Sequence, residues 1–242
     1  MVRAATVLRA GAFLALAGAL AAYYATSESW WRASTWWDVS FLAFALIPAV
    51  FGLVYLVLPW WKAHGLLFAG LALVVLAVVF SVTGLDVAAN FAKLAAVTAI
   101  AFWFLSFFET GSWVVIVALI VPWVDAYSVW RGPTKHIISQ QKELFTTLSF
   151  AFPIPGEHGS ANLGLPDLLF FGIFLAAAAR FRLRRKLTWA AMTASFGATM
   201  ALAVAFDLGG LPALPLLSLG FLAPNADLLW RQVQVSRSRP RE

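Results

Sequence analysis

Two aspartates, Asp125 and Asp167, lie inside apolar segments of the chain, in the runs IVPWVDAYSVW and NLGLPDLLFFGIF. A carboxylate near the middle of a membrane-spanning helix costs about 2.5 to 3.5 kcal/mol on insertion scales, so we expect these two to have a use. Two carboxylates at close range cannot both ionise readily, and they then share one proton. The ionised member can take a proton from water while the protonated member polarises a peptide carbonyl. This is the chemistry of aspartyl peptide hydrolysis.

The predicted depth of the two aspartates makes them a pair. Asp125 precedes Arg131, where the predicted span 112–130 reaches the outer face, and it lies about 9 Å below that face at the helical rise per residue. Asp167 follows Ser160, where the next span enters from the same face, at a similar distance. The alternative is that each aspartate caps a helix or pairs with a distant lysine such as Lys93.

The composition defines the class of protein that must position this pair. Of the 242 residues, 62% are hydrophobic and 12% are charged, and the mean hydropathy is +0.84. A soluble domain of this size cannot bury so much apolar surface. The chain has no cysteine and only 3 histidines, so cysteine-ligated metal and thiolate catalysis are excluded, and we expect no metal ion and no cofactor.

The hydropathy pattern predicts an all-α polytopic membrane protein with about eight transmembrane helices, each about 20 residues long. We interpret residues 1–242 as one integral domain, with helices 1 to 4 in 1–108 and catalytic-type helices 5 to 8 in 109–242, including an outer loop at 132–160. The predicted spans are 5–24, 40–60, 65–84, 88–108, 112–130, 163–181, 187–207 and 211–230. Two arginines before the first apolar run leave a signal peptide as the alternative for that span.

The distribution of basic residues predicts the orientation. Of the 17 Lys and Arg residues, twelve fall on the side that carries the N-terminus, so both termini should be cytoplasmic. We interpret the cluster RFRLRRK between helices 6 and 7 as a topology determinant, with a specific anionic-lipid or nucleic-acid site as the alternative. The lipid bilayer is therefore an expected partner and nucleic acid is not, while the oligomeric state stays open.

A third feature is the break in the run DLGGLPALPLLSLGF, at the head of the last predicted span. Pro212 and Pro215 remove backbone donors and disfavour regular helix nearby. In lipid, irregular backbone persists only where protein covers it or where it lines a water-filled cavity. Free backbone groups at this depth can pair with an extended substrate by strand addition.

These motifs resemble the presenilin and signal peptide peptidase family, the GxGD-type intramembrane aspartyl proteases. Asp125 followed by RGPTK resembles the first aspartate site of the family, and GLPDLLFFGIFLAAAARF resembles the second. The resemblance covers roughly residues 100–230 and implies a presenilin-like bundle that cleaves transmembrane peptides or signal peptides, with Asp125 and Asp167 as catalytic residues. It also implies six substrate-positioning residues, namely Gly164, Leu165, Pro166, and the Pro-Ala-Leu motif at Pro212, Ala213 and Leu214.

The chain departs from the family pattern at three points. Val124 stands where the family has tyrosine, Pro166 replaces the second glycine of Gly-x-Gly-Asp, and the eight predicted spans are one fewer than usual, as if an early helix were lost. Proline is tolerated at the start of a helix, so we expect extended backbone over 162–165 and then a helix with Asp167 in its first turn. Pro166 leaves a catalytically inactive relative as an alternative, and the presenilin-like and signal-peptide-peptidase-like branches both stay open.

The resulting expectation is an aspartic endopeptidase that cleaves within the membrane. A proton-coupled transporter is the alternative from another class, because transporters also place acids in their spans. In the outer loop, residues 144–152 are predicted to form a short strand or an interfacial segment. We interpret this segment as a flap over the aspartates, or else as a loop that packs its aromatic side chains on the membrane surface. Acids at span ends, including Asp227, are expected to be solvated.

Overall fold

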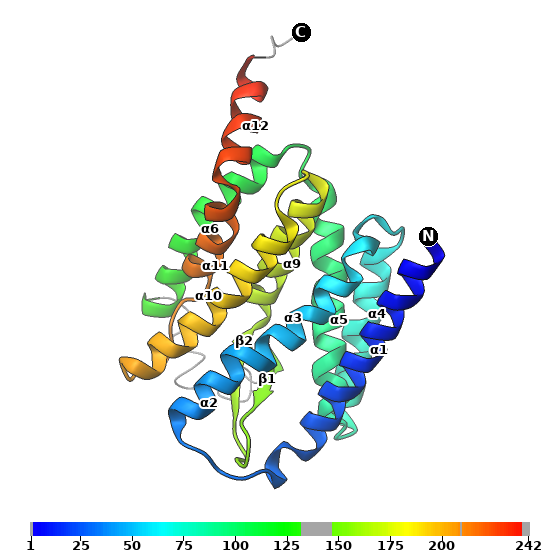
Figure 1. Cartoon of the computed structure of the whole chain (residues 1–242), viewed down its shortest axis with the longest axis vertical. Coiled ribbons are helices and arrows are strands. Elements are labelled where there is room, and N and C mark those ends of the chain that lie inside the picture. Colours follow the sequence, from blue (N-terminus) through cyan, green and yellow to red (C-terminus); the bar gives the residue numbers. More distant parts are fainter. Residues whose placement is uncertain (1, 132–146, 209, 239–242) are drawn as a thin grey trace.

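The computed structural model describes residues 2–131, 147–208 and 210–238, and most of these residues are helical. Its helices form one bundle, with a small hairpin at the end opposite α12 (Figure 1). The elements are α1 (Val2–Thr26), η1 (Ser27–Ser29), α2 (Thr35–Phe41), η2 (Leu42–Leu46), α3 (Ile47–Val57), η3 (Leu58–Lys62), α4 (Leu66–Val82), α5 (Asp86–Phe104), η4 (Leu105–Phe107), α6 (Gly111–Arg131), β1 (Ser149–Pro153), β2 (Ser160–Gly164), α9 (Leu165–Arg180), α10 (Arg185–Ala205), α11 (Leu214–Leu222), η5 (Ala223–Asn225) and α12 (Ala226–Ser238).

Several helical stretches are suited to crossing a membrane. Five are long and apolar enough by length and composition, namely Thr6–Ser29, Thr35–Lys62, Asp86–Phe107, Gly111–Val129 and Arg185–Ala205. Helices α4, α9 and α11 have 17, 16 and 9 residues, fewer than the roughly 20 that span a bilayer core. The helical membrane-protein class therefore agrees with the structure, while the count of eight spans stays a prediction.

The central helix of the bundle is α9, and its burial contrasts with that of α4. From Ile173 to Ala178 every side chain of α9 is fully buried, as expected for a helix that is apolar on all sides. Phe171 of α9 stacks on Phe51 of α3 with ring centroids 4.1 Å apart. Large apolar side chains of α4 such as Phe68 are instead exposed, which is the pattern of a lipid-facing surface.

Two glycines bring neighbouring helices into close contact. A Cβ atom on Gly172 of α9 would lie 2.7 Å from Cβ of Ala101 on α5, and one on Gly220 of α11 would lie 3.0 Å from the backbone of Ala191 on α10. Contacts this short leave no room for a side chain, and small residues of this kind are typical of helix packing in membranes. They fix α9 against α5 and α11 against α10.

One helical stretch, from α2 through η3, changes its winding next to a proline. Residues Leu42–Leu46 form a π-helical turn, and Pro48 follows at the start of α3. Proline lacks an N–H and its ring collides with the carbonyl four residues earlier, so a wider turn at this point accommodates it without ending the helix.

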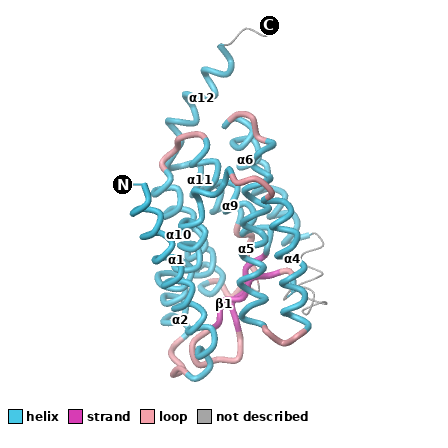
Figure 2. The backbone as a smooth tube through the Cα atoms, turned by 90° about the vertical axis from the view of Figure 1, so that its right-hand side faces the viewer, coloured by secondary structure: helices cyan, strands magenta, loops and turns pink. Residues whose placement is uncertain are grey.

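The connection between α6 and α9 carries a two-stranded antiparallel sheet, so the all-α prediction is incomplete. Strands β1 and β2 pair with Phe150 opposite Leu163 and Phe152 opposite Ala161. Phe150 and Phe152 are buried in the bundle, which anchors the hairpin. The predicted strand within 144–152 is confirmed for residues 149–152, whereas residues 144–146 lie outside the described part of the chain. The tube view shows β1 beside the lower ends of the helices (Figure 2).

Side chains from α1 and α5 bind the edge of β1 that faces away from β2. The Asn90 side chain donates to the Ala151 carbonyl and accepts from the Ala151 N–H, both at 2.9 Å. The hydroxyls of Tyr23 and Tyr24 donate to the carbonyls of Pro153 and Ala151, at 2.8 and 2.9 Å. A sheet edge inside a helical bundle needs such partners, because buried backbone groups without hydrogen bonds are costly. These hydrogen bonds attach the hairpin to α1 and α5 through β1.

Candidate functional site

Asp125 lies near the end of α6 and binds the start of α11. Its Oδ2 atom accepts a hydrogen bond from the backbone N–H of Leu214 at 3.0 Å, and the backbone of Ala213 also hydrogen-bonds to the carboxylate. The first N–H groups of a helix have no partner within the helix, so a carboxylate at this place satisfies them. Asp125 therefore does cap a helix, as the alternative interpretation required. Its side chain is nevertheless only partly buried.

Asp167 is the third residue of α9, and its carboxylate turns back to the residue before the helix. There it hydrogen-bonds to the backbone of Gly164, which is the N-cap residue of α9. This is one half of the capping-box arrangement. A Cβ atom on Gly164 would lie only 3.1 Å from Oδ2 of Asp167, so a side chain here would press on the carboxylate. Glycine is thus favoured at position 164 by the short distance to the Asp167 carboxylate. Its backbone conformation does not require glycine, since any residue can adopt its φ of −59°.

Pro166 fits the start of α9, as the sequence predicted. Strand β2 extends to Gly164, and α9 begins directly afterwards at Leu165, with Asp167 in its first turn. The extended segment is thus one residue shorter than expected, because Leu165 already belongs to the helix. The N–H of Leu165 donates to the carbonyl of Leu148 at 3.1 Å, which continues the pairing of the hairpin into the helix.

A cavity of about 560 Å³ brings the two aspartates together. Both side chains line it, and so do Gly164, Pro166 and Ala213. The charge of Asp125 also acts on the Asp167 carboxyl. Of the other residues singled out, Leu214 reaches the site through its N–H, whereas Leu165 and Pro212 are not among those that line the cavity. The structure therefore unites three sequence motifs that lie far apart along the chain.

Strand β2 forms a wall of this cavity through residues 161–164. In an antiparallel pair, the backbone groups of successive residues alternate between facing the partner strand and facing away. Ala151 directs its N–H and C=O away from β2, toward Asn90, and its partner in the register is Asn162. The N–H and C=O of Asn162 consequently point away from β1, on the edge that no strand of the described chain covers.

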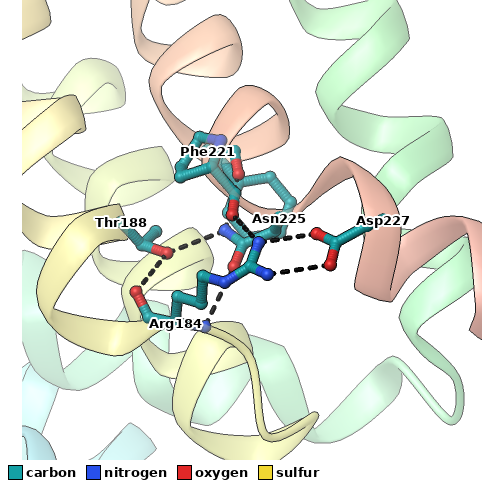
Figure 3. Close-up of polar contacts among 6 residues, drawn as sticks. Arg184, Thr188, Phe221, Asn225 and Asp227 are labelled. Carbon is teal, nitrogen blue, oxygen red and sulfur yellow. Dashed lines mark hydrogen bonds and ion pairs between the residues drawn. The ribbon is translucent and has the colours of Figure 1, made fainter.

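The far end of α11 is held by a polar cluster that joins the start of α10 to the residues directly after α11 (Figure 3). The fully buried Asn225 accepts from the N–H of Arg184 at 2.9 Å and donates to Thr188 Oγ1 and to the carbonyl of Phe221, both at 2.7 Å. The guanidinium of Arg184 binds both oxygens of Asp227, at 2.6 and 2.8 Å. Asp227 is exposed, as expected for an acid at a span end, and it also forms this ion pair, which the sequence did not predict. This ion pair lowers the pKa of the Asp227 carboxyl.

Sequence reasoning missed the clamp on β1, that is, the side chains of α1 and α5 that hydrogen-bond to the backbone of this strand. Asn90 was not singled out, and Lys93 was considered as a partner for an aspartate, yet its ammonium donates to the carbonyl of Ser149 at 3.3 Å. The sequence signal that could have revealed these contacts is the pair of Asn90 and Lys93. Both are polar within an apolar span, and residues three apart share one face of a helix. They support β1 and, through it, the strand that leads into Asp167.

Among the described residues, no group of three or more His, Asp or Glu side chains is placed to hold a metal ion. The site as built therefore consists of two carboxylates, backbone N–H groups, an open strand edge and apolar walls. Comparisons with protein-family models, with curated proteins and with solved structures found no match for this chain.

Proposed function

We propose that this chain is an intramembrane aspartyl endopeptidase that cleaves transmembrane segments or signal peptides. The observation that carries the proposal is that Asp125 and Asp167 line one cavity, where the charge of Asp125 acts on the Asp167 carboxyl. The flanking helices α6 and α10 are apolar enough to cross a membrane. Two carboxylates in such a place are the minimum set for aspartyl hydrolysis.

In the proposed reaction the two carboxylates share one proton, because two like charges at close range do not both persist. The ionised carboxylate takes a proton from water as the water oxygen attacks the carbonyl carbon of the scissile bond. The protonated carboxyl gives its proton to the carbonyl oxygen, which yields a tetrahedral diol. Transfer of a proton to the amide nitrogen then lets the C–N bond break. No covalent intermediate with the protein forms.

The backbone around the site supports the two catalytic residues in different ways. Ala213 and Leu214 hold Asp125 through hydrogen bonds from the start of α11, and Gly164 does the same for Asp167 from the start of α9. Carboxylates held at helix N-termini have a fixed direction, which is what positioning for catalysis requires. We propose that Pro166 and Pro212 act by shaping the two helix starts.

The substrate would bind as an extended segment along β2. The outward-facing N–H and C=O of Asn162 offer main-chain hydrogen bonds, and β2 continues directly into the helix that carries Asp167. Addition of a strand to an open edge aligns the backbone of a peptide irrespective of its sequence. The apolar walls of the cavity, which include Ile47, Phe196 and Met200, suit the side chains of a transmembrane segment.

Reconstitution tests this function. The purified full chain is placed in liposomes with a single-span substrate whose N-terminus lies on the same side as that of the enzyme, and the fragments are identified by mass spectrometry. Asp125→Asn and Asp167→Asn should each lower the rate of cleavage by about 10²- to 10⁴-fold. The matched control is Asp86→Asn, the same chemical change at an exposed carboxylate in the first turn of α5. Cleavage that survives both substitutions at the pair would refute the proposal.

The same experiment separates the two competing functions. Paired carboxylates in a cavity also fit a proton-coupled transporter, because such proteins move protons on intramembrane acids. A transporter would acidify or alkalinise the liposome lumen in the presence of its solute, and Asp125→Asn would stop that flux without any fragment having formed. A catalytically inactive relative would give neither fragments nor flux, with the protein folded as judged by its melting curve.

A further inference from the structure

A second cavity, of about 480 Å³, lies at the end of the bundle opposite the hairpin. Its walls come from η3, the start of α4, and the ends of α5 and α9. Asn90 of α5 contacts β1, and Phe102, which lines this cavity, lies about 18 Å further along the helix at the rise per residue. The connections from α3 to α4 and from α9 to α10 both lie toward this upper end in Figure 1.

The level of this cavity matches a membrane interface. Two candidate spans, Thr35–Lys62 and Asp86–Phe107, both end there. Trp61 and Trp103 line the cavity, and tryptophan is enriched where the hydrocarbon core meets the lipid headgroups. The cavity therefore lies where a headgroup would be found.

The charges that face the cavity are all positive. Lys62 and Arg180 line it, and none of the lining residues is acidic. Arg180 donates from Nη1 to the carbonyl of Leu105 at 2.6 Å, which fixes its guanidinium and uses one of its five N–H donors. The ammonium of Lys62 lies 4.9 Å from the centre of the Trp61 ring. Two cations on separate elements thus converge on one space.

The start of α4 adds donors to the same space. Its N-cap is Gly65, in the left-handed region with φ of 76°, and no side chain caps the helix. The first N–H groups of α4, which include those of Leu66 and Leu67, consequently have no partner within the helix, and these residues line the cavity. The helix dipole favours an anion at this place and strengthens the effect of the two cations.

An apolar track leads away from the cavity. Phe68 lines it, and Leu71 and Val75 follow on the same face of α4, with exposures of 76%, 50% and 63%. We propose that the cavity binds the phosphate of an anionic phospholipid, with the acyl chains lying along α4. Two cations and free N–H groups at the headgroup level, joined to an exposed apolar face, match the two halves of such a lipid. The proposal does not depend on the proposed catalytic activity.

Native mass spectrometry of the purified full chain tests this site. The probes are phosphatidylglycerol, phosphatidylcholine with matched acyl chains, and soluble glycerol phosphate, each titrated against the protein in detergent. The melting temperature is followed in parallel. We expect one phosphatidylglycerol to be retained at a concentration at which phosphatidylcholine is not, with a rise in melting temperature.

The variants are Lys62→Gln and Arg180→Gln, with Lys186→Gln as the matched control, since Lys186 is an exposed cation outside the cavity. Each cavity variant should bind phosphatidylglycerol about fivefold more weakly, the effect of one cation near an anionic lipid. Lys62→Gln keeps the hydrogen bond from Arg180 to Leu105, so its effect is not one of folding.

Three results would overturn the proposal. Equal retention of phosphatidylcholine and phosphatidylglycerol would show that the cavity does not select an anionic headgroup, as would equal loss of affinity in Lys62→Gln and Lys186→Gln. Equal protection by glycerol phosphate at the same concentration would assign the cavity to a soluble phosphate ester, because the apolar track would then contribute nothing.

Discussion

The two ends of α11 are both fixed by polar side chains, but in different ways. At its start, the N–H groups are held by Asp125, a partly exposed carboxylate that lines a cavity together with Asp167. At its far end, Asn225 is fully buried and hydrogen-bonds to Arg184, Thr188 and Phe221. The first arrangement leaves carboxylate oxygens facing open space, whereas the second satisfies its polar groups within the protein.

Under the proposed function, this difference distinguishes a polar group kept for structure from one kept for chemistry. A buried amide that is fully hydrogen-bonded fixes the junction between two helices, and its loss leaves unpaired groups behind. A carboxylate beside a second carboxylate has no structural need for the neighbour, because the two repel each other when both are ionised. Substitutions at the end of α11 near the hairpin should therefore lower the activity, whereas substitutions at its opposite end should lower the stability.

The largest effect is expected for Asp167→Asn. Cleavage in proteoliposomes should fall by about 10²- to 10⁴-fold, the usual contribution of an acid or base in the reaction. The melting temperature should stay close to that of the wild type, because asparagine keeps an acceptor for the backbone of Gly164. A large drop in stability with activity per folded molecule preserved would contradict the assignment of this end to chemistry.

Asn225→Leu is expected to show the opposite pattern. It removes the acceptor for the N–H of Arg184 and the donor to the carbonyl of Phe221, at a cost of about 2 to 4 kcal/mol in the free energy of unfolding. Unfolding in mixed micelles measures this loss. Gln234→Leu, a similar change at an exposed position of α12, is the control and should cost much less. Equal losses in the two variants would mean that the buried cluster does not hold the junction.

Gly164→Ala should lower activity by about 10- to 100-fold, the effect of displacing a reacting group by a fraction of an ångström to 1 Å. The added Cβ would lie 3.1 Å from Oδ2 of Asp167. Gly159→Ala is the control within the same hairpin, since a Cβ there meets nothing within 4 Å. The initial rate of cleavage is the measurement, and unchanged kinetics would show that the direction of the Asp167 carboxylate is not critical.

The smallest effect is expected at the pair of Arg184 and Asp227, whose side chains are 42% and 48% exposed. The pKa of Asp227 is lowered in the folded chain, so its stabilising effect is present above the ordinary carboxyl pKa of about 4 and is lost as the pH falls further. Asp227→Asn should slightly lower the melting temperature at pH 7, and the difference from the wild type should shrink below about pH 4. A difference that grows under acid would contradict this origin.

The sequence was informative about this site where polarity or proline interrupts an apolar run. Asp125, Asp167 and the prolines around Ala213 are such interruptions, and all three places meet at the cavity or at its edge. Asn90 and Lys93 interrupt α5 in the same manner, but their partner is the backbone of β1. Every residue type except proline offers the same backbone N–H and C=O groups, so the sequence does not show which backbone groups a side chain will bind. Neither the clamp on β1 nor the open edge of β2 could therefore be predicted from the sequence alone.

By itself the sequence determined the helical membrane class, the approximate positions of the helices, and the two carboxylates that stand out energetically from their surroundings. These follow from hydropathy and from local backbone preferences, which act over a few residues. Only the tertiary structure decided that α9 is the central helix, that Asp125 binds the start of α11, and that β2 leads into Asp167 with one edge open. Such features depend on contacts between residues far apart along the chain, which packing of the whole bundle selects and no local pattern encodes.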